Sequence, residues 1–160
     1  MEFQISEPRQ RVSAEHVLTA LHRNIRTMYL ESVPSPDLFV GLNGLKTLAE
    51  DLERWKKGGD NKARAYLKQL YDQARPVIIE RDGHGRYLKP AADVLGLPQL
   101  AEVGEDLRTI TQKWIVFRNL CLKGYRGKTM ATTLDKLHGR LLEIAALEEK
   151  ALTRWSSTVA

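Results

Sequence analysis

Apolar residues recur along this chain at alternating steps of three and four, the spacing of one face of an α-helix. The clearest stripe runs from Pro98 to Leu122. Because the opposite face of this segment is charged, the pattern predicts a long central helix that is packed on one side and solvated on the other. The stripe carries no chemistry of its own. Its apolar members are Leu100, Val103, Leu107, Ile110, Trp114, Phe117 and Cys121.

Other segments of the chain show the same spacing. We expect a first helix from Ser13, a good N-cap, to near Ser32, and a second over about residues 41–57 that stops at the following glycine pair. A third helix should start at residue 60 or 61 and either kink or restart at Pro76, with a short strand over residues 77–79 as the minor alternative. A short helix over about residues 87–95 precedes the central one, Gly124 closes the central one, and Thr129 or Thr132 opens the last.

These elements predict an all-α, single-domain bundle of five or six helices around the long central helix. The connections are short, which favours antiparallel neighbours. We expect the bundle to span residues 13–155, after an N-terminal arm over residues 1–12 and before a frayed tail over residues 156–160. A chain of 160 residues is long enough to bury a core without disulfides or a structural metal.

Composition and charge exclude several classes of protein. Cys121 is the single cysteine, so no intramolecular disulfide forms, and we expect a reduced thiol in the cytoplasm. Residues 1–8 hold no apolar run typical of a signal peptide, and no membrane span is expected. The formal net charge is +5, with 12 Lys/Arg against 11 Asp/Glu in residues 1–80 and 13 against 9 in residues 81–160. This mild bias argues against nucleic acid as a partner.

The common catalytic and metal-binding patterns do not occur. Cys121 lies on the apolar stripe, where we expect a buried thiol with a raised pKa and no reactivity. None of the four histidines has a glutamate three residues before it or a second histidine four residues away, so we predict no metal site. The run from Gly41 to Gly44 lacks the lysine and the length of a phosphate-binding loop. We expect no cofactor.

The most turn-like stretch of the chain, residues 79–87, gathers charged and aromatic residues around two glycines. Such a turn can bind an anion through backbone N–H groups and arginine side chains. The alternative is a surface turn closed by an ion pair between Glu80 and Arg86. The candidate ligand-binding residues are Glu80, Arg81, His84, Arg86 and Tyr87.

Glu148 occupies an apolar slot of the last predicted helix. A buried carboxylate is costly without a partner, and Arg86 or the Trp114 N–H could serve as one. A slightly rotated helix that leaves Glu148 in water fits the pattern equally well.

Several short motifs resemble a known family. They are the Gly-Leu-x-Gly-Leu-x-x-Leu-Ala run of residues 41–49 with Trp55, the Ile-Glu-Arg-x-Gly-x-Gly-Arg run of residues 79–86, Ala91-Ala92, Trp114 and Glu148. In this order, over about residues 13–155, they resemble the helical domain that follows the butirosin-biosynthesis H-like domain in bacterial acyltransferase-type proteins. The resemblance implies an accessory module of undefined function, because in those proteins a separate cysteine-protease-like domain supplies the nucleophile for acyl transfer from a carrier protein. We expect a stand-alone version of the helical module here.

Three functions are compatible with this sequence. The favoured hypothesis is a non-catalytic binding or interaction module, an accessory subunit of a natural-product or peptide-tailoring pathway. It predicts a homodimer or a complex with a biosynthetic partner protein, formed through an exposed apolar patch near Trp55 or Trp155. The alternative is a small helical enzyme or ligand-binding protein with an interhelical pocket for an acidic or acyl small molecule. The second alternative is a weak nucleic-acid binder.

Overall fold

The computed structural model describes residues 12–29, 41–127 and 130–160 of the chain. Within these residues five helices and no strand form, which confirms the expected all-α class. Residues 1–11 of the expected N-terminal arm, Ser32 and Thr129 lie outside the described residues. The helices are α1 (Ala14–Tyr29), α2 (Gly41–Lys57), α3 (Asp60–Leu95), α4 (Gln99–Arg126) and α5 (Met130–Val159).

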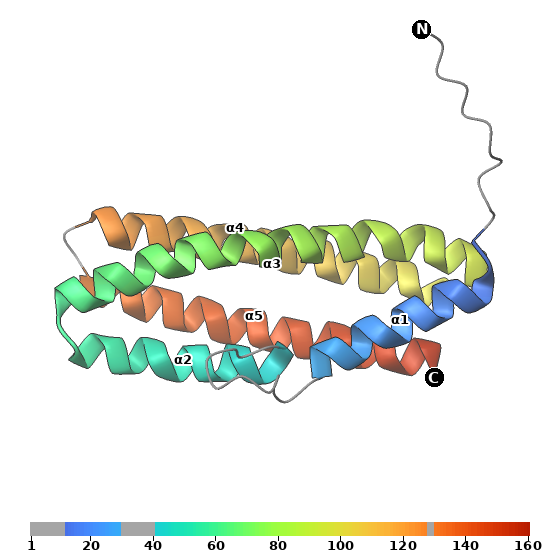
Figure 1. The fold of residues 1–160 in the computed structure, drawn as a ribbon, viewed down its shortest axis with the longest axis horizontal. Helices are drawn as coiled ribbons and strands as arrows, with labels where there is room; N and C mark the ends of the chain where they lie inside the picture. The colour runs from blue at the N-terminus through green and yellow to red at the C-terminus, as the bar shows by residue number, and fades with distance from the viewer. Residues whose placement is uncertain (1–11, 30–40, 128–129) are drawn as a thin grey trace, which may run out of the picture.

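The helices fill four positions of a bundle, and the first position is divided between α1 and α2 (Figure 1). These two follow one another along one side of the molecule and run in the same direction, after which α3, α4 and α5 run alternately up and down. In space α3 packs on α4, α4 on α5, and α5 on both α1 and α2. The short connections from α2 onward produce this antiparallel order, as the sequence predicts.

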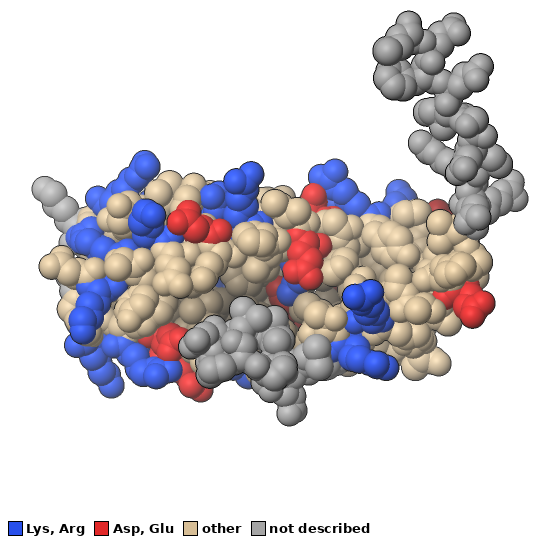
Figure 2. Space-filling view, viewed as in Figure 1, with Lys and Arg blue, Asp and Glu red and all other residues tan. Residues whose placement is uncertain are grey.

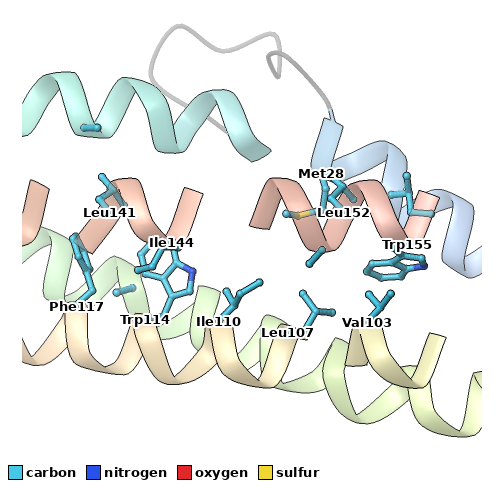
Figure 3. Close-up of a cluster of buried hydrophobic side chains, with 14 of the residues drawn as sticks. Met28, Val103, Leu107, Ile110, Trp114, Phe117, Leu141, Ile144, Leu152 and Trp155 are labelled. Carbon is cyan, nitrogen blue, oxygen red and sulfur yellow. The ribbon is translucent and has the colours of Figure 1, made fainter. Parts of the chain in front are cut away.

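The core lies between stripes of buried side chains on the long helices. All seven apolar residues of the stripe predicted within residues 98–122 are buried on α4, which confirms that helix and its packed face. Figure 3 shows Ile144 and Leu141 of α5 directed toward Trp114 and Phe117 of α4. Alternating steps of three and four are typical of helices that pack side by side along their length. Burial of each large apolar side chain contributes about 1.5–3 kcal/mol to this packing.

The helix α3 is the main departure from the expected secondary structure. It continues without a break through Pro76, through residues 79–87 and through Pro90, so the expected restart at Pro76, strand, turn and separate short helix are wrong. An interior proline costs a helix about 3 kcal/mol and a glycine about 1 kcal/mol. The helix persists because it packs along α4 and buries its own stripe of side chains from Ala63 to Ala92. Both prolines are exposed, on the side away from this contact.

Two glycines allow α3 and α4 to approach closely. A Cβ atom added at Gly104 would lie 2.9 Å from the carbonyl oxygen of Gly85, and one added at Gly85 would lie 3.1 Å from the carbonyl oxygen of Gly104. These distances leave no room for a methyl group in a closely packed interior. Gly85 therefore serves the packing of two helices and does not form a turn.

The remaining helix ends lie near the predicted positions, with two exceptions. As expected, α2 stops before the glycine pair and α3 ends at Leu95, where Gly96 adopts left-handed backbone with φ of 67°. However, α4 continues past Gly124 to Arg126, and α5 contains Thr132 and stays helical to Val159, so the expected frayed tail is wrong. None of the described helices combines the length and the apolar character needed to cross a bilayer.

Candidate functional site

Two charged residues occupy positions that are otherwise apolar in the packed stripes. Every seventh residue of α3 from position 67 to position 88 is buried, and these residues are Leu67, Ala74, Arg81 and Leu88. On α5, Glu148 continues the buried stripe and is 1% exposed. Because apolar neighbours fix the rotation of both helices, Arg81 and Glu148 are directed into the interior.

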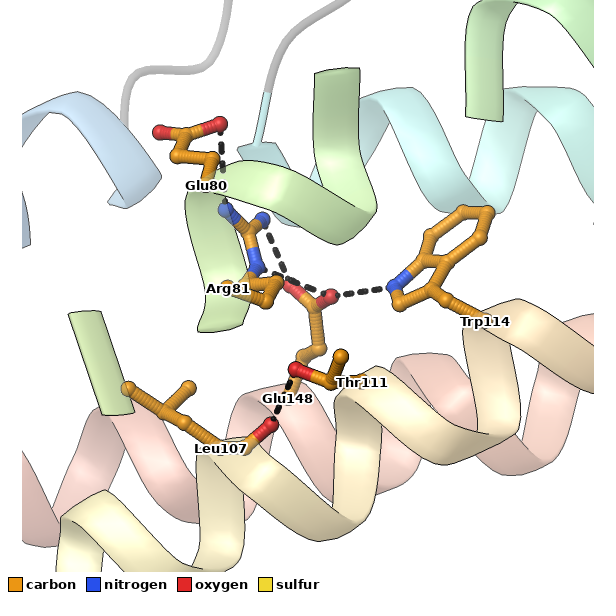
Figure 4. A network of polar contacts seen from close by, with 6 residues as sticks. All are labelled: Glu80, Arg81, Leu107, Thr111, Trp114 and Glu148. Atoms are coloured by element: carbon orange, nitrogen blue, oxygen red, sulfur yellow. Dashed lines mark hydrogen bonds and ion pairs between the residues drawn. The ribbon is translucent and has the colours of Figure 1, made fainter. Parts of the chain in front are cut away.

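Arg81 and Glu148 form a buried ion pair with two hydrogen bonds (Figure 4). Arg81 Nε donates to Glu148 Oε1 at 3.1 Å, and Arg81 Nη2 donates to Oε2 at 2.9 Å. Trp114 Nε1, on α4, donates to the same Oε1 at 2.8 Å. The carboxylate therefore connects α3, α4 and α5 at one point. Trp114 was an expected partner of a buried Glu148, whereas the arginine is Arg81 and not Arg86.

Glu80 provides a second carboxylate on the outer side of the pair. Its Oε2 lies 3.4 Å from Arg81 Nη1, and its side chain is 52% exposed, so this contact contributes little. Arg81 Nη1 is buried and has no hydrogen bond within the described part of the chain. Thr111 is drawn beside Glu148 in Figure 4, but its hydroxyl donates to the carbonyl oxygen of Leu107 at 2.8 Å.

The chemistry open to this pair is limited because the carboxylate of Glu148 already accepts hydrogen bonds from Arg81 and Trp114. Both carboxylate oxygens of Glu148 accept hydrogen bonds, and a general base needs access to a substrate proton. The cavity beside the pair has a volume of about 10 Å³, which is close to the space of one water molecule. The arrangement fixes three helices relative to one another and leaves no room for an acyl substrate beside Glu148.

His84 is the titratable neighbour of the ion pair. It lies one turn after Arg81, lines the same cavity, and meets the ring of Trp155 edge to face with centroids 5.8 Å apart. Burial lowers the pKa of His84 below its ordinary value, while Glu80 opposes this shift and Arg81 reinforces it. The imidazole is therefore neutral near pH 7. Trp155 Nε1 is buried and has no acceptor among the described residues.

The helix separates the five candidate ligand-binding residues that a turn would have gathered. Arg81 is buried and His84 is half-buried, both on the inner side of α3. Glu80, Arg86 and Tyr87 are exposed. The structure therefore keeps Glu80, Arg81 and His84 near one another, whereas Arg86 and Tyr87 do not line the cavity that Arg81 and His84 share.

The predicted ion pair between Glu80 and Arg86 is also wrong. Arg86 Nη2 lies 2.7 Å from a carboxylate oxygen of Asp82, and the Arg86 side chain is 77% exposed. Residues four apart are neighbours on a helix surface, whereas residues six apart are not. The exposed pair contributes at most about 1 kcal/mol to stability.

The single cysteine has the predicted environment. Cys121 is buried on the α4 stripe, and burial raises the pKa of its thiol to about 12. The thiol stays protonated at neutral pH and does not act as a nucleophile. Within residues 12–29, 41–127 and 130–160, no group of three His, Cys, Asp or Glu side chains is placed to hold a metal ion.

The sequence does not indicate that Arg81 pairs with Glu148, because the glycines within residues 79–87 predict a turn. A turn gives the Arg81 side chain no fixed direction. The seven-residue spacing from Leu67 to Leu88 is the signal that places Arg81 in the core. The other residues that line the cavity carry no chemical signal in the sequence, because each is an ordinary core residue. They are Met28, Leu107, Leu152 and Trp155.

Comparison with known proteins identifies a family. No curated protein matches the chain. One family model does, and it matches residues 1–154. Its description is "Domain of unknown function (DUF4872)" and states no activity, ligand or partner. Because this match covers nearly the whole sequence, the chain belongs to the DUF4872 family.

Proposed function

We propose that this chain is a non-catalytic helical interaction module that acts by binding another protein chain. The contrast between its interior and its surface carries the proposal. In the interior, Arg81 and Trp114 donate hydrogen bonds to both carboxylate oxygens of Glu148. On the surface, large apolar side chains stay exposed on three helices. They are Tyr66, Ile79, Tyr87 and Val94 on α3, Val116 and Tyr125 on α4, and Leu142 on α5.

Only one of the two tryptophans expected to mark a binding surface supports the proposal. Trp55 is partly exposed and stacks on Tyr66 with ring centroids 4.3 Å apart, which joins the end of α2 to the beginning of α3. Aromatic side chains with an apolar body are enriched at protein interfaces. Trp155 is 2% exposed, so the expectation of an exposed patch there is wrong.

The resemblance to the helical domain of butirosin-biosynthesis H-like proteins supplies the wider setting of the proposal. In that setting the chain is an accessory subunit of a natural-product or peptide-tailoring pathway in the cytoplasm, where a reduced Cys121 is stable. Its partner is a second copy of the chain or a biosynthetic protein. The alternative of an interhelical ligand pocket receives no support from the small cavity beside Glu148.

Native mass spectrometry of the full chain, purified gently from its own host, tests this function. The proposal predicts a homodimer or a complex with another protein. A bare monomer would contradict it, and so would a monomer that carries one small molecule in fixed stoichiometry. The same sample measured under denaturing conditions gives the mass of the chain alone and serves as the control.

A further inference from the structure

An open, shallow groove lies between the outer sides of α4 and α5, and we call it the α4–α5 groove. Its volume is about 520 Å³, and it is distinct from the small cavity beside the ion pair, since the two share no lining residue. The groove is lined by Val116, Leu120, Lys136, Gly139, Arg140 and Glu143.

The floor of the groove is apolar and low. Val116 is 43% exposed, and Leu120, four residues later on the same side of α4, is partly buried. Gly139 faces them from α5, and a Cβ atom added there would meet nothing within 4 Å. A glycine inside a helix costs about fivefold in the folding equilibrium relative to alanine. The packing of the described residues does not explain this glycine, but it leaves space for a backbone that approaches from outside.

Basic side chains line the groove on its α5 side, where Lys136 and Arg140 lie, whereas the two lining residues of α4, Val116 and Leu120, are apolar. Glu143 is the only carboxylate among the six lining residues, and it accepts hydrogen bonds from Lys113 at 2.6 Å and from Arg140 at 2.8 Å. Lys123 lies three residues after Leu120, on the same stripe of α4. Neither Lys123 nor Lys136 forms an ion pair with a described residue, so their charges remain available.

Basic side chains also gather at one end of the bundle (Figure 2). Figure 2 shows Lys and Arg side chains gathered where α2 leads into α3, the end at which α4 also leads into α5. Arg64 of α3 donates to the carbonyl oxygen of Tyr125 at 3.0 Å, which ties this end of α3 to the end of α4. The net charge of the chain, +5, favours the approach of an acidic partner.

We propose that the α4–α5 groove docks an acidic amphipathic helix of a partner protein. The apolar face of that helix lies over Val116, Leu120 and Gly139, and its Asp and Glu residues meet Lys136 of α5 and Lys123 of α4. Two adjacent helices form a groove into which a third packs with axes 8–10 Å apart. The charges favour rapid association and exclude basic partners. A nucleic acid fits less well, because none of the described side chains that line the groove is aromatic and could stack with a base.

This inference rests on the proposed function, and photo-crosslinking tests the two separately. The full chain is produced in its own host with a photoreactive benzoylphenylalanine in place of Gly139. The matched control has the same replacement at Gly83, which is exposed on α3 and also has nothing within 4 Å of an added Cβ atom. After irradiation, mass spectrometry identifies the crosslinked peptide.

We expect the variant at position 139 to capture a segment of another protein with more acidic than basic residues. Adding Lys136→Glu should reduce the yield about fivefold, whereas the exposed Lys89→Glu, with the same change in charge, should leave it unchanged. Capture of a second copy of this chain, a nucleic acid, a lipid or a non-acidic segment at position 139 overturns the inference, as does an equal effect of the two lysine changes. Protein captured only at position 83 overturns the groove and keeps the interaction module, and no capture at either position overturns both.

Discussion

Replacing Glu148 with glutamine tests whether the buried ion pair holds the long helices together. The substitution keeps the size of the side chain and removes its charge. The Arg81 side chain, 8% exposed, then keeps a buried charge whose nearest carboxylate is the exposed Glu80 at 3.4 Å. Breaking one side of a buried pair costs about 3–5 kcal/mol, a large part of the 5–15 kcal/mol that stabilises a typical domain. The midpoint of thermal unfolding should fall by about 6–20 °C.

Urea unfolding of a small set of variants measures this effect. Far-UV circular dichroism follows the helices, and tryptophan fluorescence follows the three tryptophans, among them Trp114, whose N–H donates to Glu148. The double variant Arg81→Met/Glu148→Leu removes both charges, so it should be more stable than either single variant. The double variant will not recover all of the lost stability, because the Trp114 N–H loses its acceptor at a cost of about 1–3 kcal/mol.

Glu149→Gln is the matched control for Glu148→Gln, because residue 149 is exposed on the same helix. We expect it to change the free energy of unfolding by no more than about 0.5 kcal/mol. Two results would refute the reasoning. One is a free energy of unfolding for Glu148→Gln that lies within about 1 kcal/mol of the value for the unchanged protein. The other is a loss of stability in the double variant that equals the sum of the losses in its two single variants.

Three further predictions concern the glycines of α3, the cysteine and the histidine. In urea unfolding, Gly83→Ala should stabilise the fold by up to about 1 kcal/mol. Gly85→Ala should destabilise it by about 1–3 kcal/mol, because the added Cβ atom would lie 3.1 Å from the Gly104 carbonyl oxygen. Equal effects of the two substitutions would contradict the close contact between α3 and α4. Cys121 should not react with a thiol reagent such as DTNB in the native protein and should react fully in guanidinium chloride; prompt labelling of the native protein would show that it is not buried. Because folding lowers the pKa of His84 below 6.5, the unfolded chain binds more protons, so the free energy of unfolding should fall as pH drops through and below 6.5. Urea unfolding at about pH 7.5 and about pH 5 should show a smaller fall for His84→Gln, and an equal fall would count against the assignment.

The hydrophobic pattern was sufficient to predict the helices but not their continuity. The stripe within residues 98–122 predicts α4 because its apolar spacing and its packing agree. In α3 the local signals of Pro76, Gly83 and Gly85 oppose the helix, and contacts with α4 outweigh them. Local propensity cannot show this, because the stabilising surface belongs to another part of the chain.

The candidate site was predictable only in part, for a related reason. The cost of burying a carboxylate predicts that Glu148 has a partner, and the pattern offers Trp114 as one. The choice between Arg81 and Arg86 depends on the rotation of a helix that the sequence appears to interrupt. The α4–α5 groove depends on the spacing of two helices, which no single stripe contains.

The division of the first bundle position between α1 and α2 also affects how the chain folds during its synthesis. Contacts among α3, α4 and α5 join consecutive segments and can form quickly. Both α1 and α2 also pack on α5, which begins only at Met130. At a translation rate of about 5–20 residues per second, Val17, Leu21 and Ile25 of α1 wait about 5–20 seconds for that surface. Until α5 has left the ribosome, this stripe of α1 lacks one of its packing partners and is more accessible to chaperones and to neighbouring nascent chains.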